Sequence, residues 1–288
     1  MIVVLNIFIL LKHQNQNLLN MKPITRFATI ILTLGLGFLF SSCQKENVTD
    51  PSQQTTKTDS ERRLIRTFYG PTIPFEGGIA RAWVSEDLRG TPLAVGVNFS
   101  ERALKNLPTV PKDYILKLPN HSATDFFKHV FINWNPLGHE PDPIYGLPHF
   151  DIHFYNITSA ERMLIGPNDS IQFANAPDTQ YVPPFYLQIP GGVPEMGAHW
   201  IDLLSPEFSG SLFTQTFILG SYDGEFIFWE PMITLDYFLT RPDVTIPIRQ
   251  PQAFHQEGWY PQNYRISFST SPNEYTVALT DLMHHQAQ

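Results

Sequence analysis

The chain has 288 residues and a formal net charge of −8, with 27 acidic against 19 basic side chains. This acidity makes the protein a poor candidate for binding nucleic acid or for adhering electrostatically to anionic lipid, because both are negatively charged. Cys43 is the single cysteine, so the chain can form no internal disulfide and its core must be held by burial alone.

Residues 1–42 have the pattern of an export signal. Lys22 and Arg26 form a basic region, residues 27–40 are apolar, and small residues stand directly before Cys43. This order is typical of a bacterial lipobox and predicts that Cys43 carries a lipid. We therefore expect a protein of the bacterial cell envelope, held on the membrane by a lipid anchor at the periplasmic or the outer surface.

The lipobox departs from the usual pattern at Phe40, where a small or aliphatic residue is common. A plain membrane anchor is the alternative, but the apolar run is short for a span, which takes about 20 residues. Residues 1–20 contain an apolar patch with no basic residue ahead of it, so we interpret them as a mis-start upstream of Met21. Removal of residues 1–42 takes away three basic residues and no acid, which changes the net charge from −8 to −11.

The residues after the signal divide into a tether and a folded domain. Residues 43–63 contain almost no large apolar side chain and are predicted to be flexible. Residues 64–288 show short alternating or aromatic runs broken by Gly, Pro, Asn and Asp, a pattern typical of sheets joined by turns. We predict a single, mainly β domain, antiparallel and barrel-like or sandwich-like, with a few short helices.

Ten segments of this domain have the composition of strands. They cover residues 78–85, 93–98, 114–118, 127–134, 149–155, 213–220, 225–229, 244–248, 264–268 and 275–279. The sequences SYDG at 221–224 and SPNE at 271–274 predict hairpin turns. Helices are predicted at 100–107, with Ser100 as its cap, and at 159–164.

The stretch at residues 133–155 combines three histidines, three carboxylates and four prolines. Prolines that stiffen the backbone beside groups able to bind a cation or move protons are typical of a pre-shaped site. Within it, HFDIHFY alternates in the manner of a strand. One face carries Phe150, Ile152 and Phe154, and the other carries His149, Asp151, His153 and Tyr155.

Spacing limits what this strand can bind. His149 and His153 would lie about 13 Å apart along a straight strand, and Asp151 about 6.6 Å from each. A zinc-like ion takes its ligands at about 2.0 to 2.2 Å, so either one histidine with Asp151 ligates, or Asp151 orients a histidine. A helix would place both histidines on one face, but Pro148 and the aromatic and β-branched residues favour a strand.

Other segments must complete the site. His139 and Glu140 precede a proline-rich turn, and His199 lies in the glycine-containing segment MGAHW, flanked by Glu195. The predicted metal ligands are His139, His149, His153 and His199. Asp151 and Glu140 are the candidate catalytic groups, with Glu195 as a further ligand or proton-handling partner. A single-ion site would require the four imidazoles to converge within about 5 Å, and Glu230 ranks lower because acids at strand ends are usually solvated.

Three functions fit this pattern. The first is a His/Asp-rich pocket that binds a divalent metal such as zinc, or a small ligand. The second is a metal-assisted or His/Asp acid-base enzyme, a hydrolase or an isomerase. The third is a structural or interaction protein in which the same side chains form a buried hydrogen-bonded network. Residues 43–288 contain no G-x-S-x-G, phosphate-binding glycine loop or H-E-x-x-H motif.

The blocks NWNP, GHEP, PHFD-x-HFY and GAHW, spread over residues 77–282, resemble a family of exported bacterial proteins of unknown function. A sigma-E-controlled Thermus protein typifies this family. The resemblance implies a β-rich fold and a homo-oligomer, and it brings no established activity. Its motifs include His139, His149, Asp151, His153 and His199. Asn133 stands where the resemblance leads us to expect an aspartate, which removes one acid from the site.

Overall fold

The computed structural model describes residues 65–121 and 125–288. The predicted export signal, the lipidation of Cys43 and the tether at 43–63 lie outside these residues. The described residues belong to one compact unit that extends from Arg63 to Gln288. Within them, no helix is both long enough and apolar enough to cross a membrane.

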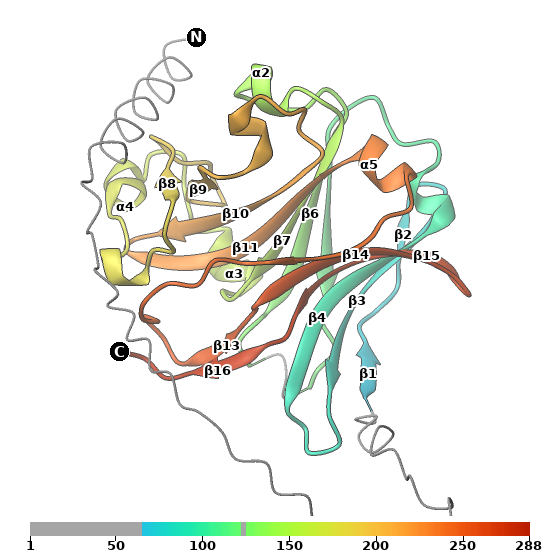
Figure 1. Cartoon of the computed structure of the whole chain (residues 1–288), viewed down its shortest axis with the longest axis horizontal. Helices are drawn as coiled ribbons and strands as arrows, with labels where there is room; N and C mark the ends of the chain where they lie inside the picture. Colours follow the sequence, from blue (N-terminus) through green and yellow to red (C-terminus); the bar gives the residue numbers. More distant parts are fainter. Residues whose placement is uncertain (1–64, 122–124) are drawn as a thin grey trace, which may run out of the picture. The chain divides into compact units, whose positions relative to one another are not determined.

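Two seven-stranded antiparallel sheets form the framework (Figure 1). The first has the order β1-β3-β4-β15-β14-β12, with β2 paired to β3. Its strands are β1 (Arg66–Tyr69), β2 (Ile73–Phe75), β3 (Gly78–Glu86), β4 (Pro92–Ser100), β12 (Asp243–Pro247), β14 (Asn263–Thr270) and β15 (Asn273–Thr280).

The second sheet has the order β5-β6-β7-β11-β10-β9-β8. Its strands are β5 (Lys112–Lys117), β6 (His129–Asn135), β7 (His149–Tyr155), β8 (Tyr186–Gln188), β9 (Ala198–Asp202), β10 (Gln215–Tyr222) and β11 (Glu225–Thr234). A separate ribbon pairs β13 (Gly258–Tyr260) with β16 (Met283–His285).

The helices are short and lie in the connections. The α-helices are α2 (Asp142–Tyr145), α3 (Ser159–Arg162), α4 (Ser170–Ala174) and α5 (Leu235–Leu239). The 3-10 helices are η1 (Glu101–Leu104), η3 (Thr179–Tyr181) and η4 (Pro206–Ser209). The helix predicted at 159–164 is confirmed as α3, which begins with a reciprocal capping box between Thr158 and Glu161.

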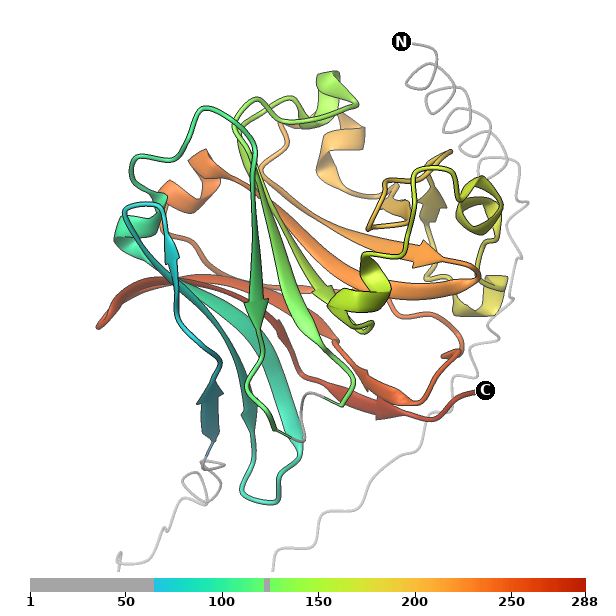
Figure 2. The same cartoon turned by 180° about the vertical axis from the view of Figure 1, so that it is seen from behind.

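The main core lies between the two sheets and is rich in phenylalanine. The rings of Phe75 and Phe99, from the first sheet, each lie 6.2 Å from the ring of Phe150 in the second. Figures 1 and 2 show the sheets as two layers from opposite sides. Neither sheet closes on itself along the described strands, so the mainly antiparallel β prediction is confirmed in its sandwich-like form.

The alternation predicted for HFDIHFY is present in β7. Phe150, Ile152 and Phe154 belong to the core between the sheets. Asp151 and His153 lie on the other face of the second sheet and are nevertheless buried. They are covered because connecting segments, among them the loop before β9, pack over this face and border a cavity there.

All ten predicted strands are present; the strand at 149–155 has the predicted bounds, and the other nine have shifted ends. The largest difference is β11, which continues through Pro231 to Thr234 and so places Glu230 inside a strand rather than at its end. The hairpin at 221–224 is confirmed, since Asp223 and Gly224 both have positive φ angles, 49° and 88°.

The helix predicted at 100–107 is wrong, because only the 3-10 helix η1 forms there. Ser100 does not cap it through its side chain. The Ser100 hydroxyl instead accepts a hydrogen bond from the backbone N–H of Ile79, at 3.0 Å. The Ser100 hydroxyl, which was expected to cap the helix, is therefore used in a contact with the neighbouring strand β3.

Candidate functional site

A cavity of about 510 Å³ lies on the outer face of the second sheet. Its polar lining consists of Asn133, Asn135, His139, Glu140, Tyr145, Asp151, His153, His199 and Glu230. Its apolar lining comes from the loop that precedes β9 and from β10 and β11: Ile189, Pro190, Val193, Met196, Ile218 and Met232. The cavity thus gathers residues that are distant in the sequence.

Strand pairing explains how these residues meet. In the second sheet β7 lies between β6 and β11, so that Asp151 is opposite Asn133 on one side and Met232 on the other. Two small apolar clusters on the same face flank the polar residues. One is built around Tyr155, Ile165 and Phe228, and the other around Tyr145, Phe213 and Met232.

The first of two ligand groups consists of His139, His149 and Asp151. One nitrogen or oxygen atom from each of these residues lies within 4.8 Å of the others. His149 Nε2 is 3.0 Å from Asp151 Oδ1, and His139 Nε2 is 3.4 Å from Asp151 Oδ2. The Asn135 amide donates a 2.7 Å hydrogen bond to Oδ2. Asp151 therefore stands between two imidazoles and is held by a neighbouring strand.

The second group consists of His153, His199 and Glu230, and it repeats this arrangement. Glu230 Oε1 is 3.5 Å from His153 Nε2, and Oε2 is 4.0 Å from His199 Nε2. The ring of Phe228 lies edge-on to both imidazoles, with centroid distances of 4.9 Å to His153 and 5.4 Å to His199. Each group thus offers two histidines and one carboxylate.

Backbone carbonyls fix the orientation of three of the histidines. The Nδ1 atoms of His139, His149 and His153 lie 2.8, 2.6 and 3.3 Å from the carbonyl oxygens of Glu140, Leu147 and Phe131. A carbonyl oxygen only accepts, so Nδ1 is the donor in each bond. In a neutral ring Nε2 then keeps its lone pair, and that lone pair points toward a carboxylate. Metal-bound histidines are commonly oriented in this way.

Several of these facing atoms are buried without a hydrogen-bond partner. They are His149 Nε2, Asp151 Oδ1, His153 Nε2 and Glu230 Oε2. Buried polar atoms are almost always partnered, because an unpaired one loses its hydration without compensation. An imidazole lone pair facing a carboxylate oxygen is repulsive unless a proton or a cation lies between them. The arrangement is therefore one that either a shared proton or a bound cation would stabilise.

Burial shifts the pKa values of the site in different directions. It raises the pKa of Glu230 well above its usual value, and the charge of Asp151 adds to this effect. Burial also acts to raise the pKa of Asp151, but His149 and His139 outweigh it and leave that pKa lowered. Burial lowers the pKa of His153 to about 3 and that of His199 to about 4. Both imidazoles are neutral at pH 7 and have the protonation state a metal requires.

The structure divides the four predicted histidines between the two groups, rather than bringing them to one point. Glu140 lines the cavity, but neither group contains it. Glu195 is turned away, and its carboxylate forms a 2.8 Å ion pair with the buried Arg162. Glu230, rather than Glu140 or Glu195, supplies the carboxylate of the second group. In the sequence FIFWE, residues 226–230, Phe228 and Glu230 are two positions apart, so a strand that continues past Pro231 places both side chains on one face. This alternation is the sequence signal that could have identified Glu230.

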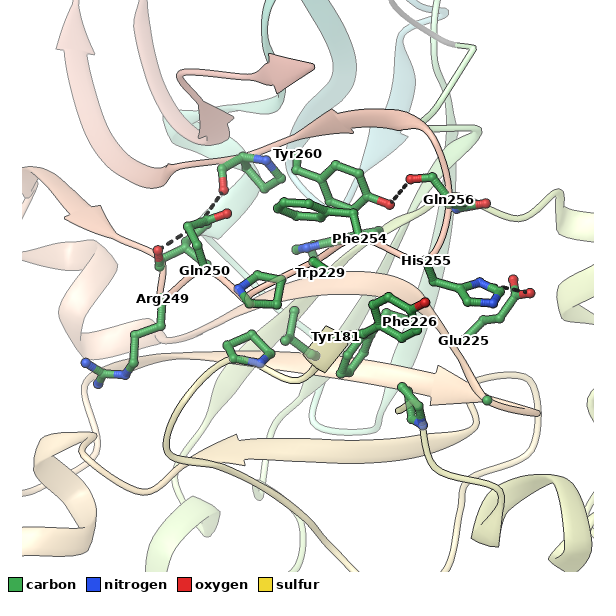
Figure 3. A pocket seen from close by; sticks show the side chains of 18 residues that line it. Tyr181, Glu225, Phe226, Trp229, Arg249, Gln250, Phe254, His255, Gln256 and Tyr260 are labelled. Atoms are coloured by element: carbon green, nitrogen blue, oxygen red, sulfur yellow. Dashed lines mark hydrogen bonds and ion pairs between the residues drawn. The ribbon is translucent and has the colours of Figure 1, made fainter. Parts of the chain in front are cut away.

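A smaller cavity of about 50 Å³ lies between strands β10 and β11 of the second sheet and the segment at residues 248–261 (Figure 3). Its lining is aromatic and proline-rich, and includes Trp229, Phe254 and Tyr260. The Tyr260 hydroxyl donates to the carbonyl of Gln256, and His255 pairs with Glu225. Trp229, Phe254 and Tyr260 also belong to the main core, so this cavity is continuous with the packing between the sheets.

Comparison with curated proteins and with solved structures gave no match for this chain. Residues 87–134 match the model of a family described as TTHB210-like, hypothetical protein TTHB210. The matched segment includes β4, β5 and most of β6, and it ends before the two ligand groups. It supports the resemblance to a family of unknown function that a Thermus protein typifies.

Proposed function

We propose that this is a lipid-anchored protein of the bacterial cell envelope whose pocket binds divalent metal ions of the zinc class. The anchoring is supported by the signal pattern that ends at Cys43. The metal binding is supported by the two groups of histidines and carboxylates around one cavity.

The observation that carries the metal proposal is the set of buried, unpartnered atoms that face one another. His149 Nε2 and Asp151 Oδ1 face each other at 3.0 Å in the interior, and neither atom has another hydrogen-bond partner. Zinc binds neutral imidazole nitrogen and carboxylate oxygen, and an ion between such atoms removes their repulsion. Asn135 and the carbonyl of Leu147 supply the outer hydrogen bonds that usually orient these ligands.

Elemental analysis of protein purified without chelator, followed by titration with Co²⁺ and Zn²⁺, tests this proposal. Wild-type protein should retain metal, give a visible Co²⁺ absorption band and melt at a higher temperature with Zn²⁺. His149→Ala and His199→Ala should each reduce the metal content. His284→Ala is the matched control, because His284 also faces a carboxylate, that of Glu257, at 3.2 Å on the surface.

A purely structural role for the same side chains predicts a different result. In that case the alanine variants would melt at lower temperature, while no ion would stabilise the wild type or bind to it. Absence of bound metal in every preparation, with no thermal shift by Zn²⁺ or Co²⁺, would rule out the metal proposal.

Metal-assisted hydrolysis is a second candidate function, and the ligand count favours it. Each group has three protein ligands, as catalytic zinc sites do, which leaves a coordination position for water or substrate. The 510 Å³ cavity is of the size that holds a small molecule. Turnover of small esters or phosphoesters that disappears in Asp151→Asn and on chelation would support this function; a metal-loaded protein inactive on the whole panel would contradict it.

A further inference from the structure

The two ligand groups are neighbours in the second sheet. Met232 is opposite Asp151 across β7 and β11, and Glu230 is two residues along the same strand. Asp151 and Glu230 are therefore diagonal neighbours, a relationship that places Cα atoms about 7 to 8 Å apart. Both side chains line the same cavity, so two ions bound there would share one solvent-filled space.

The charge of the cavity depends on how many ions it holds. Three carboxylates line it, those of Glu140, Asp151 and Glu230. Among the described residues of the lining, none is lysine or arginine. With all three carboxylates ionised, one divalent ion leaves one net negative charge, whereas two divalent ions leave one net positive charge. Two ions bound to Asp151 and Glu230 hold both carboxylates in their ionised form and therefore give the pocket a net positive charge.

The coordination positions that no protein atom fills decide which kind of molecule can bind to the ions. Each group offers three protein ligands, and five of the six ligand residues line the cavity, with the buried His149 as the exception. An oxyanion with several terminal oxygens in the cavity would therefore be in reach of both ions. A phosphate group fills only a small part of 510 Å³. Beside it stands an apolar wall formed by Ile189, Val193 and Ile218, which suits an organic substituent.

We propose that the two groups each hold one divalent ion and together bind the phosphate group of a small monoester, whose organic part lies against the apolar wall. This inference rests on the proposed metal binding and adds the number of ions and the class of ligand. It requires both ions, because each ion makes a separate contact with the phosphate oxygens.

Metal stoichiometry and phosphate binding in the full chain, solubilised in detergent and loaded with Zn²⁺, provide the test. His139→Ala and His199→Ala remove one ligand from each group at its more exposed histidine, so that damage to the core is small. His139→Gln and His199→Gln serve as second variants, and the melting temperature of each variant checks folding. His284→Ala is again the control.

The wild type should hold two ions per chain, and each variant one. Calorimetric titration should show phenyl phosphate binding to the loaded wild type and to His284→Ala, at least tenfold weaker binding to each single-group variant, and none without metal. Inorganic phosphate should follow the same dependence on metal with at least tenfold lower affinity. Equal affinity for inorganic phosphate would overturn the monoester and leave free phosphate as the ligand.

The outcomes separate this inference from the metal proposal. A wild type that holds no ion removes both. A wild type that holds a single ion, or that holds two ions and binds neither phosphate compound, overturns the two-ion inference and leaves metal binding in place. Unchanged phosphate affinity in both single-group variants would also overturn it.

Discussion

Gly220 lies directly beneath the ring of Phe228 on the neighbouring strand. A Cβ atom at Gly220 would come within 1.9 Å of Phe228 Cε1, a separation that no packing can tolerate. Because the Phe228 ring lies edge-on to both His153 and His199, the absence of a side chain at Gly220 helps to determine where these imidazoles lie.

Gly220→Ala should therefore displace Phe228 and disturb the second ligand group. We expect a loss of stability of about 1 to 3 kcal/mol from overpacking and weaker metal binding by His153 and His199, with the first group unaffected. Urea denaturation and metal stoichiometry measure the two effects. Gly166→Ala is the control, because its Cβ would meet Asp169 at an ordinary 3.4 Å; equal behaviour of the two variants would contradict the argument.

Asp151→Asn tests the carboxylate of the first group. Asparagine keeps the shape of the side chain but removes the charge that faces His139 and His149. Metal should be lost from this group, which Co²⁺ absorption would detect as a smaller visible band. Asp113→Asn is a matched control, since Asp113 accepts a 2.6 Å hydrogen bond from Asn133 on the adjacent strand and lies outside both groups. A full Co²⁺ band in Asp151→Asn would exclude Asp151 as a ligand.

The strand at His149–Tyr155 and its polar face could be predicted from sequence because the information is local. Alternation sets which side chains share a face, and Pro148 limits where the strand begins. The strand rise also predicts that His149 and His153 cannot share one ion with Asp151. In the structure His149 faces Asp151, while His153 turns to Glu230.

The partner of His153 could not be predicted in the same way. Its identity depends on β11 pairing beside β7, a contact between segments about 75 residues apart that no local pattern encodes. Pro231 also concealed the length of β11, because proline usually ends a central strand. The prediction that Glu230 is solvated failed for this reason, since the acid is buried inside the strand.

Cys43→Ser tests the membrane attachment. Without the thiol no acyl chain can be added, and the protein should leave the membrane fraction for the soluble fraction. Fractionation of cells, with mass measurement of the mature chain, detects both the shift and the missing lipid. Deletion of residues 2–20 is the matched control and should leave attachment unchanged, because Met21 is the expected initiator; a Cys43→Ser protein that stays in the membrane with an unchanged mass would contradict lipidation.

His129 should make the stability of the metal-free protein depend on pH. Its ring is buried and parallel to that of Tyr155, and burial, with a further contribution from the charge of Arg162, lowers its pKa from 6.5 to about 4. The unfolded chain therefore binds a proton more readily than the folded chain, so this contribution to stability is complete above pH 6.5 and is lost as the pH falls toward 4. Between pH 7 and pH 5 the loss is about 2 kcal/mol.

In His129→Phe, which keeps a ring against Tyr155, the free energy of unfolding should fall by that much less over the same interval. His153 and His199 titrate in the same direction in both proteins, so only the difference between the two urea series reports on His129. Replacement of the surface residue His284 by Phe controls for the change in histidine content, and identical pH dependence of wild type and His129→Phe would show that His129 is not buried in its neutral form.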